Sequence, residues 1–178
     1  MEFLKKNILN ENKETAKVYM TKNISAEGLL AVYNALGRKA EGRTAVKISS
    51  GEPGGHNYLK PEMIGRLVKE VNGTIVECNT AYGGRRCDTE SHMKVMKEHG
   101  FSDIAPVEIM DAEGSMSLPV RGGKHLREDM VGKGFEKYDF LVNLAHFKGH
   151  AMGGFGGVLK NMSIGIASSM GKSLIHTA

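Results

Sequence analysis

The sequence predicts an α/β protein with a mainly parallel sheet flanked by helices. Short β-branched runs alternate with amphipathic helical patterns along the 178 residues, which is typical of βαβ units. The length fits one domain of roughly 100 to 200 residues. With 40% hydrophobic and 25% charged residues, the composition excludes a disordered tail protein, a collagen and a small disulfide scaffold. We therefore expect a polar tail over residues 1–16 and a single α/β domain over residues 17–178.

Five strands are expected from runs rich in β-branched and other apolar residues. They cover residues 17–20, 44–49, 74–78, 107–110 and 139–145. The last run, DFLVNLA, is the clearest buried strand, because an apolar run of this length suits a sheet that is covered on both faces. The segment 112–137 is broken by glycines, and we expect a hairpin there through residues 118–120.

Helices are expected where apolar residues recur with helical spacing between start and stop signals. The signals are Ser25 and Gly37 for the first helix, Pro61 for the start of the second, and Asp88 or Thr89 with Gly100 for the third. A fourth helix is expected over residues 158–167. His92 and His99 belong to the third helix, where we expect them to be solvated or to cap it.

The charge pattern favours a small anionic partner. Lys and Arg number 24 against 20 acidic residues, and they are spread along the chain, whereas a nucleic-acid site would need them gathered on one face. No stretch resembles a signal peptide or a membrane span, so we expect a cytoplasmic protein without membrane contact. The chain stops abruptly at SLIHTA. We therefore expect an incomplete N-terminal portion of a longer chain, completed by a C-terminal half or a homo-oligomer.

Ligands of open α/β sheets bind beyond the carboxyl ends of the strands, and polar residues follow four successive strands here. The expected ligand-binding residues among them are Glu52, His56, Asn79, Thr80, Asp111 and Lys148. We expect one cleft to be lined by His56, Asn79, Asp111, His146, His150 and Lys160. The alternative for each residue is an ordinary polar loop position, since surface loops are polar in any case.

The segment HFKGHAMGGFGGVLKN is the most informative part of the chain. His146 and His150 are four residues apart and can share one face of a turn, where imidazoles bind metal ions. Three glycines are expected to let backbone N–H groups approach an anion or a cofactor, namely Gly154, Gly156 and Gly157. Alternatively, the glycines only form a tight turn and the histidines bond loop carbonyls.

The segment GIASSMGKS resembles a phosphate-binding P-loop but has one residue too many between Gly165 and Gly171. We therefore do not expect nucleotide hydrolysis. Lys172 and Ser173 are expected at a helix end or in a loop.

Several segments resemble the domain of unknown function 362 family, whose members are often labelled uncharacterised iron–sulfur-centre proteins. The segments that carry this resemblance are KISSGEPGGHNYLKPE, VECNTAYGGRR, IMDAEG, HFKGHAMGGFGGVLKNMSIGIASSMGK and IHTA. The resemblance implies an α/β domain within a longer chain and an iron–sulfur cluster. Cys78 and Cys87 are the only cysteines, and we expect them to be reduced. Such a cluster normally needs four thiolates, so we expect none in this chain alone.

A shorter match, from His150 through Gly154, Phe155 and Gly157 to Lys160, is similar to a segment of the nickel-pincer lactate racemase family. That likeness implies that Lys160 holds a cofactor covalently and that His150 works beside it.

Three functions follow as hypotheses. The first is an enzyme, an oxidoreductase or isomerase, that binds a small carboxylate-type anion or a metal-containing cofactor. In it Lys160 is the anchor and His150 an acid, base or metal ligand, and the chemistry is redox, proton or hydride transfer. The second is an iron–sulfur-associated electron-transfer module. The third is a non-catalytic anion-binding domain.

Overall fold

The computed structural model describes residues 16–151 and 153–178. Four strands form one parallel sheet in the order β3-β2-β1-β6. Their bounds are Thr44–Lys47 for β1, Gly73–Glu77 for β2, Val107–Ile109 for β3 and Phe140–Asn143 for β6. The parallel sheet with flanking helices confirms the predicted α/β fold class. Of the predicted tail over residues 1–16, only Ala16 lies within the described residues.

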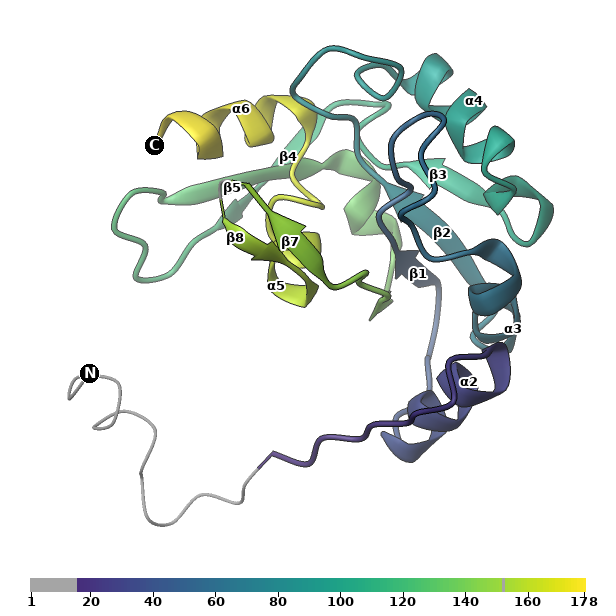
Figure 1. Cartoon of the computed structure of the whole chain (residues 1–178). Helices are drawn as coiled ribbons and strands as arrows, with labels where there is room; N and C mark the ends of the chain where they lie inside the picture. Colours follow the sequence, from purple (N-terminus) through teal and green to yellow (C-terminus); the bar gives the residue numbers. More distant parts are fainter. Residues whose placement is uncertain (1–15, 152) are drawn as a thin grey trace, which may run out of the picture.

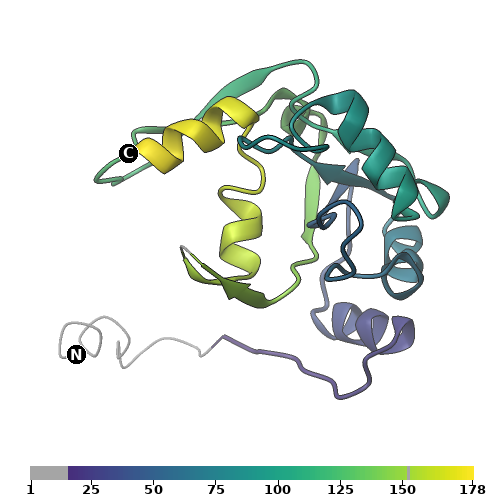
Figure 2. The same ribbon diagram turned by 45° about the horizontal axis from the view of Figure 1, so that its top comes forward.

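Three helices cover one face of the sheet (Figures 1 and 2). They are α2 (Ala26–Ala35), α3 (Pro61–Glu70) and α4 (Thr89–Glu98), followed by the short 3-10 helix η1 (Phe101–Asp103). Val46 and Ile75 from the two central strands pack with Leu67 of α3 and Met96 of α4 in one buried cluster. Because successive strand residues point to opposite faces, their neighbours Ala45 and Val76 belong to a second cluster on the other face.

The second face is covered by another set of elements. These are the antiparallel hairpin of β4 (Ser115–Pro119) and β5 (Glu128–Gly132), the 3-10 helix η2 (Lys133–Lys137), and the helices α5 (Val158–Met162) and α6 (Ser169–Thr177). A short antiparallel ribbon of β7 (Lys148–His150) and β8 (Gly154–Gly156) joins β6 to α5. The ribbon, α5 and α6 lie across the sheet from α2, α3 and α4 (Figure 2).

The predicted helix starts are confirmed by their capping contacts. The Ser25 side chain accepts a hydrogen bond from the Gly28 N–H, and Asp88 accepts one from the Ser91 N–H. Pro61 occupies the first position of α3. These signals are local, so the sequence alone suffices to find them. The hairpin through residues 118–120 is confirmed in β4 and β5.

Three predicted elements need correction. Residues 17–20 form no strand, and Val18 and Met20 are 88% exposed, so this run has neither a partner strand nor a core. The run around β6 is not the most buried strand, because β6 lies at the sheet edge while all four residues of β1 are buried. Helix α5 ends at Met162 because the chain then turns tightly, so that a Cβ at Gly165 would lie 2.2 Å from the Asn161 carbonyl oxygen.

Among the residues that the structure describes, no helix combines the length and the apolar character that crossing a bilayer requires.

Candidate functional site

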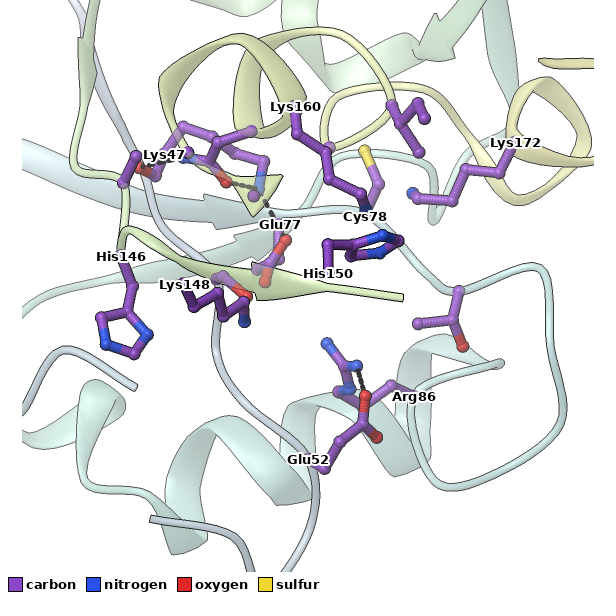
Figure 3. A pocket seen from close by; sticks show the side chains of 18 of the residues that line it. Lys47, Glu52, Glu77, Cys78, Arg86, His146, Lys148, His150, Lys160 and Lys172 are labelled. Atoms are coloured by element: carbon purple, nitrogen blue, oxygen red, sulfur yellow. Dashed lines mark hydrogen bonds and ion pairs between the residues drawn. The ribbon is translucent and has the colours of Figure 1, made fainter. Parts of the chain in front are cut away.

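A cavity of about 280 Å³ opens at the carboxyl ends of β1, β2 and β6 (Figure 3). The ribbon, α5, α6 and the loops that follow β1 and β2 form its walls. Eight predicted site residues line it, namely Glu52, Thr80, His146, Lys148, His150, Gly156, Gly157 and Lys160. This position agrees with the rule that open α/β sheets bind ligands beyond their strand ends.

Four other predicted site residues do not line this cavity. His56 lies exposed in the loop after β1, and Gly154 is exposed in the ribbon. Asp111 connects two backbone segments, since its two carboxylate oxygens accept hydrogen bonds from the N–H groups of Asn79 and Ser169, both at 2.9 Å. The Asn79 side chain donates to Thr89 on α4. Asp111 and Asn79 thus connect the elements around the cavity rather than facing into it.

A buried ion pair forms the floor of the cavity. The Nζ atom of Lys47 donates to Glu77 Oε2 at 2.8 Å, to Asn161 Oδ1 at 3.0 Å and to the Ile48 carbonyl at 2.5 Å. Lys47 is 1% exposed and Glu77 5%. Burial alone would raise the pKa of Glu77, but the Lys47 charge lowers it to about 2. An ammonium group has three donors, so Lys47 has none left for a ligand.

His92 lies fully buried beside this pair, which corrects the expectation that it is solvated or caps α4. Its Nδ1 is 3.2 Å from Asn79 Oδ1 and its Nε2 is 3.3 Å from the Ser50 hydroxyl. Since the amide oxygen can only accept, we assign the ring proton to Nδ1 and let Nε2 accept from Ser50. Burial lowers the pKa of His92 to about 4, so the imidazole is neutral at pH 7.

Lys172 is a cavity residue that the sequence reasoning missed. It lies within α6, not at a helix end or in a loop, and is 9% exposed. Its Nζ donates to the carbonyls of Asn79 and Ala167 at 2.7 and 2.5 Å. Two acceptors among the described residues leave one N–H of the ammonium for a ligand. A local signal existed, because Ser168 caps α6 four residues earlier and so fixes where the helix begins.

Lys148 and Lys160 approach each other over a glycine. A Cβ atom at Gly156 would lie 3.7 Å from Lys148 Cγ and 3.7 Å from Lys160 Cδ. Because Gly156 has no side chain, the aliphatic parts of both lysines can pack over this residue of β8. In the described part of the chain, neither ammonium group forms an ion pair. Burial first, and then the charges of Lys148 and Lys47, lower the pKa of Lys160.

The opposite wall carries Arg86, which is 9% exposed and points into the cavity (Figure 3). Its Nη2 donates to the Glu52 carboxylate and, at 2.8 Å, to the Tyr82 hydroxyl. The Tyr82 hydroxyl in turn donates to Glu52 Oε1 at 2.8 Å. The Nε atom of Arg86 is buried and has no partner among the described residues. Because this atom is shielded from the cavity, a ligand would have to meet the Nη side of the guanidinium, where only Nη2 is bonded to described acceptors.

His150 in the ribbon and His146 just before it differ in their bonding. His150 Nδ1 accepts a hydrogen bond from the Gly153 N–H at 3.0 Å, so we assign its ring proton to Nε2. His146 Nδ1 is buried without a partner among the described residues. A third imidazole, His176 at the end of α6, also lines the cavity. Residues 16–151 and 153–178 contain no group of three His, Cys, Asp or Glu side chains placed to hold a metal ion, and the predicted metal pair stays a prediction.

Comparison with protein families identifies a match that covers most of the chain. A family model described as "Domain of unknown function (DUF362)" matches residues 44–178. The chain belongs to this family. The match begins at β1 and includes every residue that lines the cavity. No curated protein and no solved structure matches the DUF362 chain. The iron–sulfur association and the likeness to lactate racemase gain no support from these comparisons.

The thiols of the DUF362 chain do not fit the donor set of a four-thiolate cluster. Both cysteines are free, with Cys78 buried and Cys87 exposed. Cys78 lines the cavity, but its Sγ donates to the Ile166 carbonyl at 3.2 Å. Burial raises the pKa of this thiol to about 12, whereas a metal ligand must be a thiolate.

We accordingly expect the chain, purified without oxygen, to contain iron and sulfide far below one four-iron cluster per molecule. Elemental analysis and the visible absorption spectrum measure this directly. A brown protein with stoichiometric iron and sulfide would contradict the expectation. The variant Cys87→Ser would then show whether the exposed thiol is one of the ligands.

Proposed function

We propose that this cavity binds a small anion of the carboxylate type. The supporting observation is an excess of cationic charge. Glu77 is paired with Lys47, and Glu52 with Arg86. Three further lysines reach the cavity and form no ion pair with any described residue, namely Lys148, Lys160 and Lys172. A concave site lined by one sign of charge concentrates oppositely charged ligands.

The size of the cavity supports a small ligand. Its volume is about 280 Å³, just below the roughly 300–1,000 Å³ of typical small-molecule sites. A compound with one or two carboxylates and a few carbon atoms suits this volume, whereas a dinucleotide does not.

His150 and Lys160 carry the chemistry in this proposal. Both side chains line the cavity, and both can exchange a proton with a ligand that the cationic groups hold. Proton transfer beside a carboxylate is therefore the reaction that we propose, which makes an isomerase the favoured class. If the ligand binds but no reaction follows, the domain is a non-catalytic anion-binding module.

We expect Lys160→Met to weaken binding of malonate at least tenfold while the fold stays intact. A charge-assisted hydrogen bond is worth roughly 1.5–3 kcal/mol, and about 1.4 kcal/mol corresponds to tenfold in affinity. Malonate at a fixed saturating concentration should then raise the Tm of the variant by about 3–6 °C less than that of the parent.

The matched control is Lys97→Met on the exposed side of α4, which removes the same charge away from the cavity. It should keep the full malonate shift. Equal shifts for the Lys160 variant and the parent would show that Lys160 does not bind the anion. No shift for the parent would reject malonate-like anions as ligands.

A further inference from the structure

We propose that Lys160 attacks the carbonyl carbon of a small 2-oxo acid and forms a Schiff base with it. This inference rests on the proposed anion site and adds to it a substrate class and a covalent step. Lysine amines that lie partly desolvated next to a second cation are activated nucleophiles toward carbonyl compounds. Lys160 meets both conditions, since it is half-buried and its stem runs beside that of Lys148 over Gly156.

The hydrogen bonds of the cavity single out Lys160 among its lysines. Lys47 has all three donors engaged, one of them by a carboxylate, so it is not available to attack a ligand. Burial lowers the pKa of Lys172 as well, but its Nζ is held by two carbonyls, and these bonds favour the charged form and direct the amine away from a ligand carbon. Lys148 is exposed to solvent. Lys160 is both sheltered and free of an anionic partner among the described residues, so neutralising it breaks no ion pair.

The opposite wall can hold the carboxylate of the substrate. Lys172 keeps one N–H, and the Arg86 guanidinium lines the same cavity with only its Nη2 bonded to described acceptors. Figure 3 shows Lys160 entering the cavity from α5, Lys172 from α6 and Arg86 from the facing wall. A 2-oxo acid bound through its carboxylate at Arg86 and Lys172 would present the adjacent carbonyl group toward Lys160.

The reaction balances without an oxidant or a reductant. The lone pair of the Lys160 amine forms a bond to the carbonyl carbon, and the π electrons of the carbonyl move to its oxygen. A proton passes from nitrogen to that oxygen and gives a carbinolamine. The hydroxyl then leaves as water after it takes a second proton from the neighbouring Lys148 ammonium group, and the Nε2–H of the neutral His150 ring can donate a hydrogen bond to the departing oxygen. The resulting iminium ion acidifies the neighbouring C–H bond and thereby assists the proposed proton transfer.

The test is reductive trapping on the full chain. The protein is incubated with pyruvate and sodium cyanoborohydride, and the adduct is located by peptide mass spectrometry. We expect one adduct per chain, on Lys160. The decisive variant is Lys160→Arg, which keeps the charge but cannot form an imine. It should lose the adduct and still respond to malonate in thermal melts, whereas Lys97→Met should keep both.

The outcomes separate the two proposals. An adduct spread over surface lysines, or one that persists in Lys160→Arg, overturns the Schiff-base proposal. A malonate response without any adduct on Lys160 leaves the anion site standing and rejects the covalent step. An adduct on Lys160 without a malonate response rejects the dicarboxylate as ligand and keeps the nucleophile. A folded Lys160→Met variant that lacks the adduct supports the proposal.

Discussion

Replacing Glu77 by Gln is expected to lower the free energy of unfolding by about 3–5 kcal/mol, the usual cost of removing one partner from a buried ion pair. Lys47 would keep its charge at 1% exposure, with only neutral acceptors left around it. The same change also weakens the acceptor for the Ser50 N–H, which bonds Glu77 Oε1 at 2.8 Å. Both losses act at the centre of the sheet, so the whole domain should be affected.

Urea and thermal unfolding measure this effect. For a domain of this size, 1 kcal/mol moves the Tm by about 2–4 °C, so a fall of about 6–20 °C is expected. The matched control is Glu90→Gln on α4, which breaks the exposed pair with Lys94. Exposed pairs at this helical spacing are worth about 0.3–0.5 kcal/mol. Similar decreases in Tm for the two variants would show that the buried pair stabilises the fold no more than an exposed pair does.

The double variant Lys47→Met, Glu77→Met tests the cause. It removes both charges at once, and apolar replacement of a whole buried pair is often neutral or stabilising. We therefore expect the double variant to be more stable than Glu77→Gln. A double variant that is less stable would place the main stabilisation in the hydrogen bonds to Asn161 and Ser50 rather than in charge compensation.

Much of this fold could be predicted because its signals are local. Ser25, Pro61 and Asp88 mark helix starts through contacts within a few residues. The expected position of the site at the strand ends also follows from chain order, and it brings Glu52, Lys148 and Lys160 to one cavity. A parallel sheet makes this possible, since all of its strands end at one edge.

The residues that sequence reasoning missed depend on contacts between distant parts of the chain. Lys47 stands within an apolar strand, and its partner Glu77 comes 30 residues later. Lys172 turns inward because its acceptors are the Asn79 carbonyl, 93 residues away, and the Ala167 carbonyl. The position of His92 in α4 does not distinguish it from an exposed helix residue. Its hydrogen-bond partners, Asn79 and Ser50, come from other parts of the chain. Periodicity carries no information about such partners.

The free energy of unfolding is expected to fall as the pH drops below neutrality, and His92 should be the main cause. Burial is the main effect that lowers the pKa of His92 from 6.5 to about 4. The Arg86 charge adds to this effect, and the Glu77 charge opposes it. Between these values the unfolded chain binds a proton that the folded chain does not, so acid favours unfolding. A shift of this size corresponds to about 3 kcal/mol. The pKa of Glu77 is lowered from 4.5 to about 2, so between these pH values the unfolded chain again binds a proton that the folded chain does not. The free energy of unfolding therefore continues to fall at more acidic pH.

The variant His92→Gln isolates this contribution, because an amide fills the site without titrating. We expect it to be less stable than the parent at pH 7, since the bonds to Ser50 and Asn79 are imperfectly replaced. Its stability should nevertheless change much less than that of the parent between pH ~7 and ~4. His125→Gln, in the exposed loop between β4 and β5, should follow the parent curve. Urea unfolding at several pH values gives the free energy of unfolding of all three proteins. The same pH dependence for His92→Gln and the parent would mean that the pKa of His92 does not differ between the folded and unfolded chain.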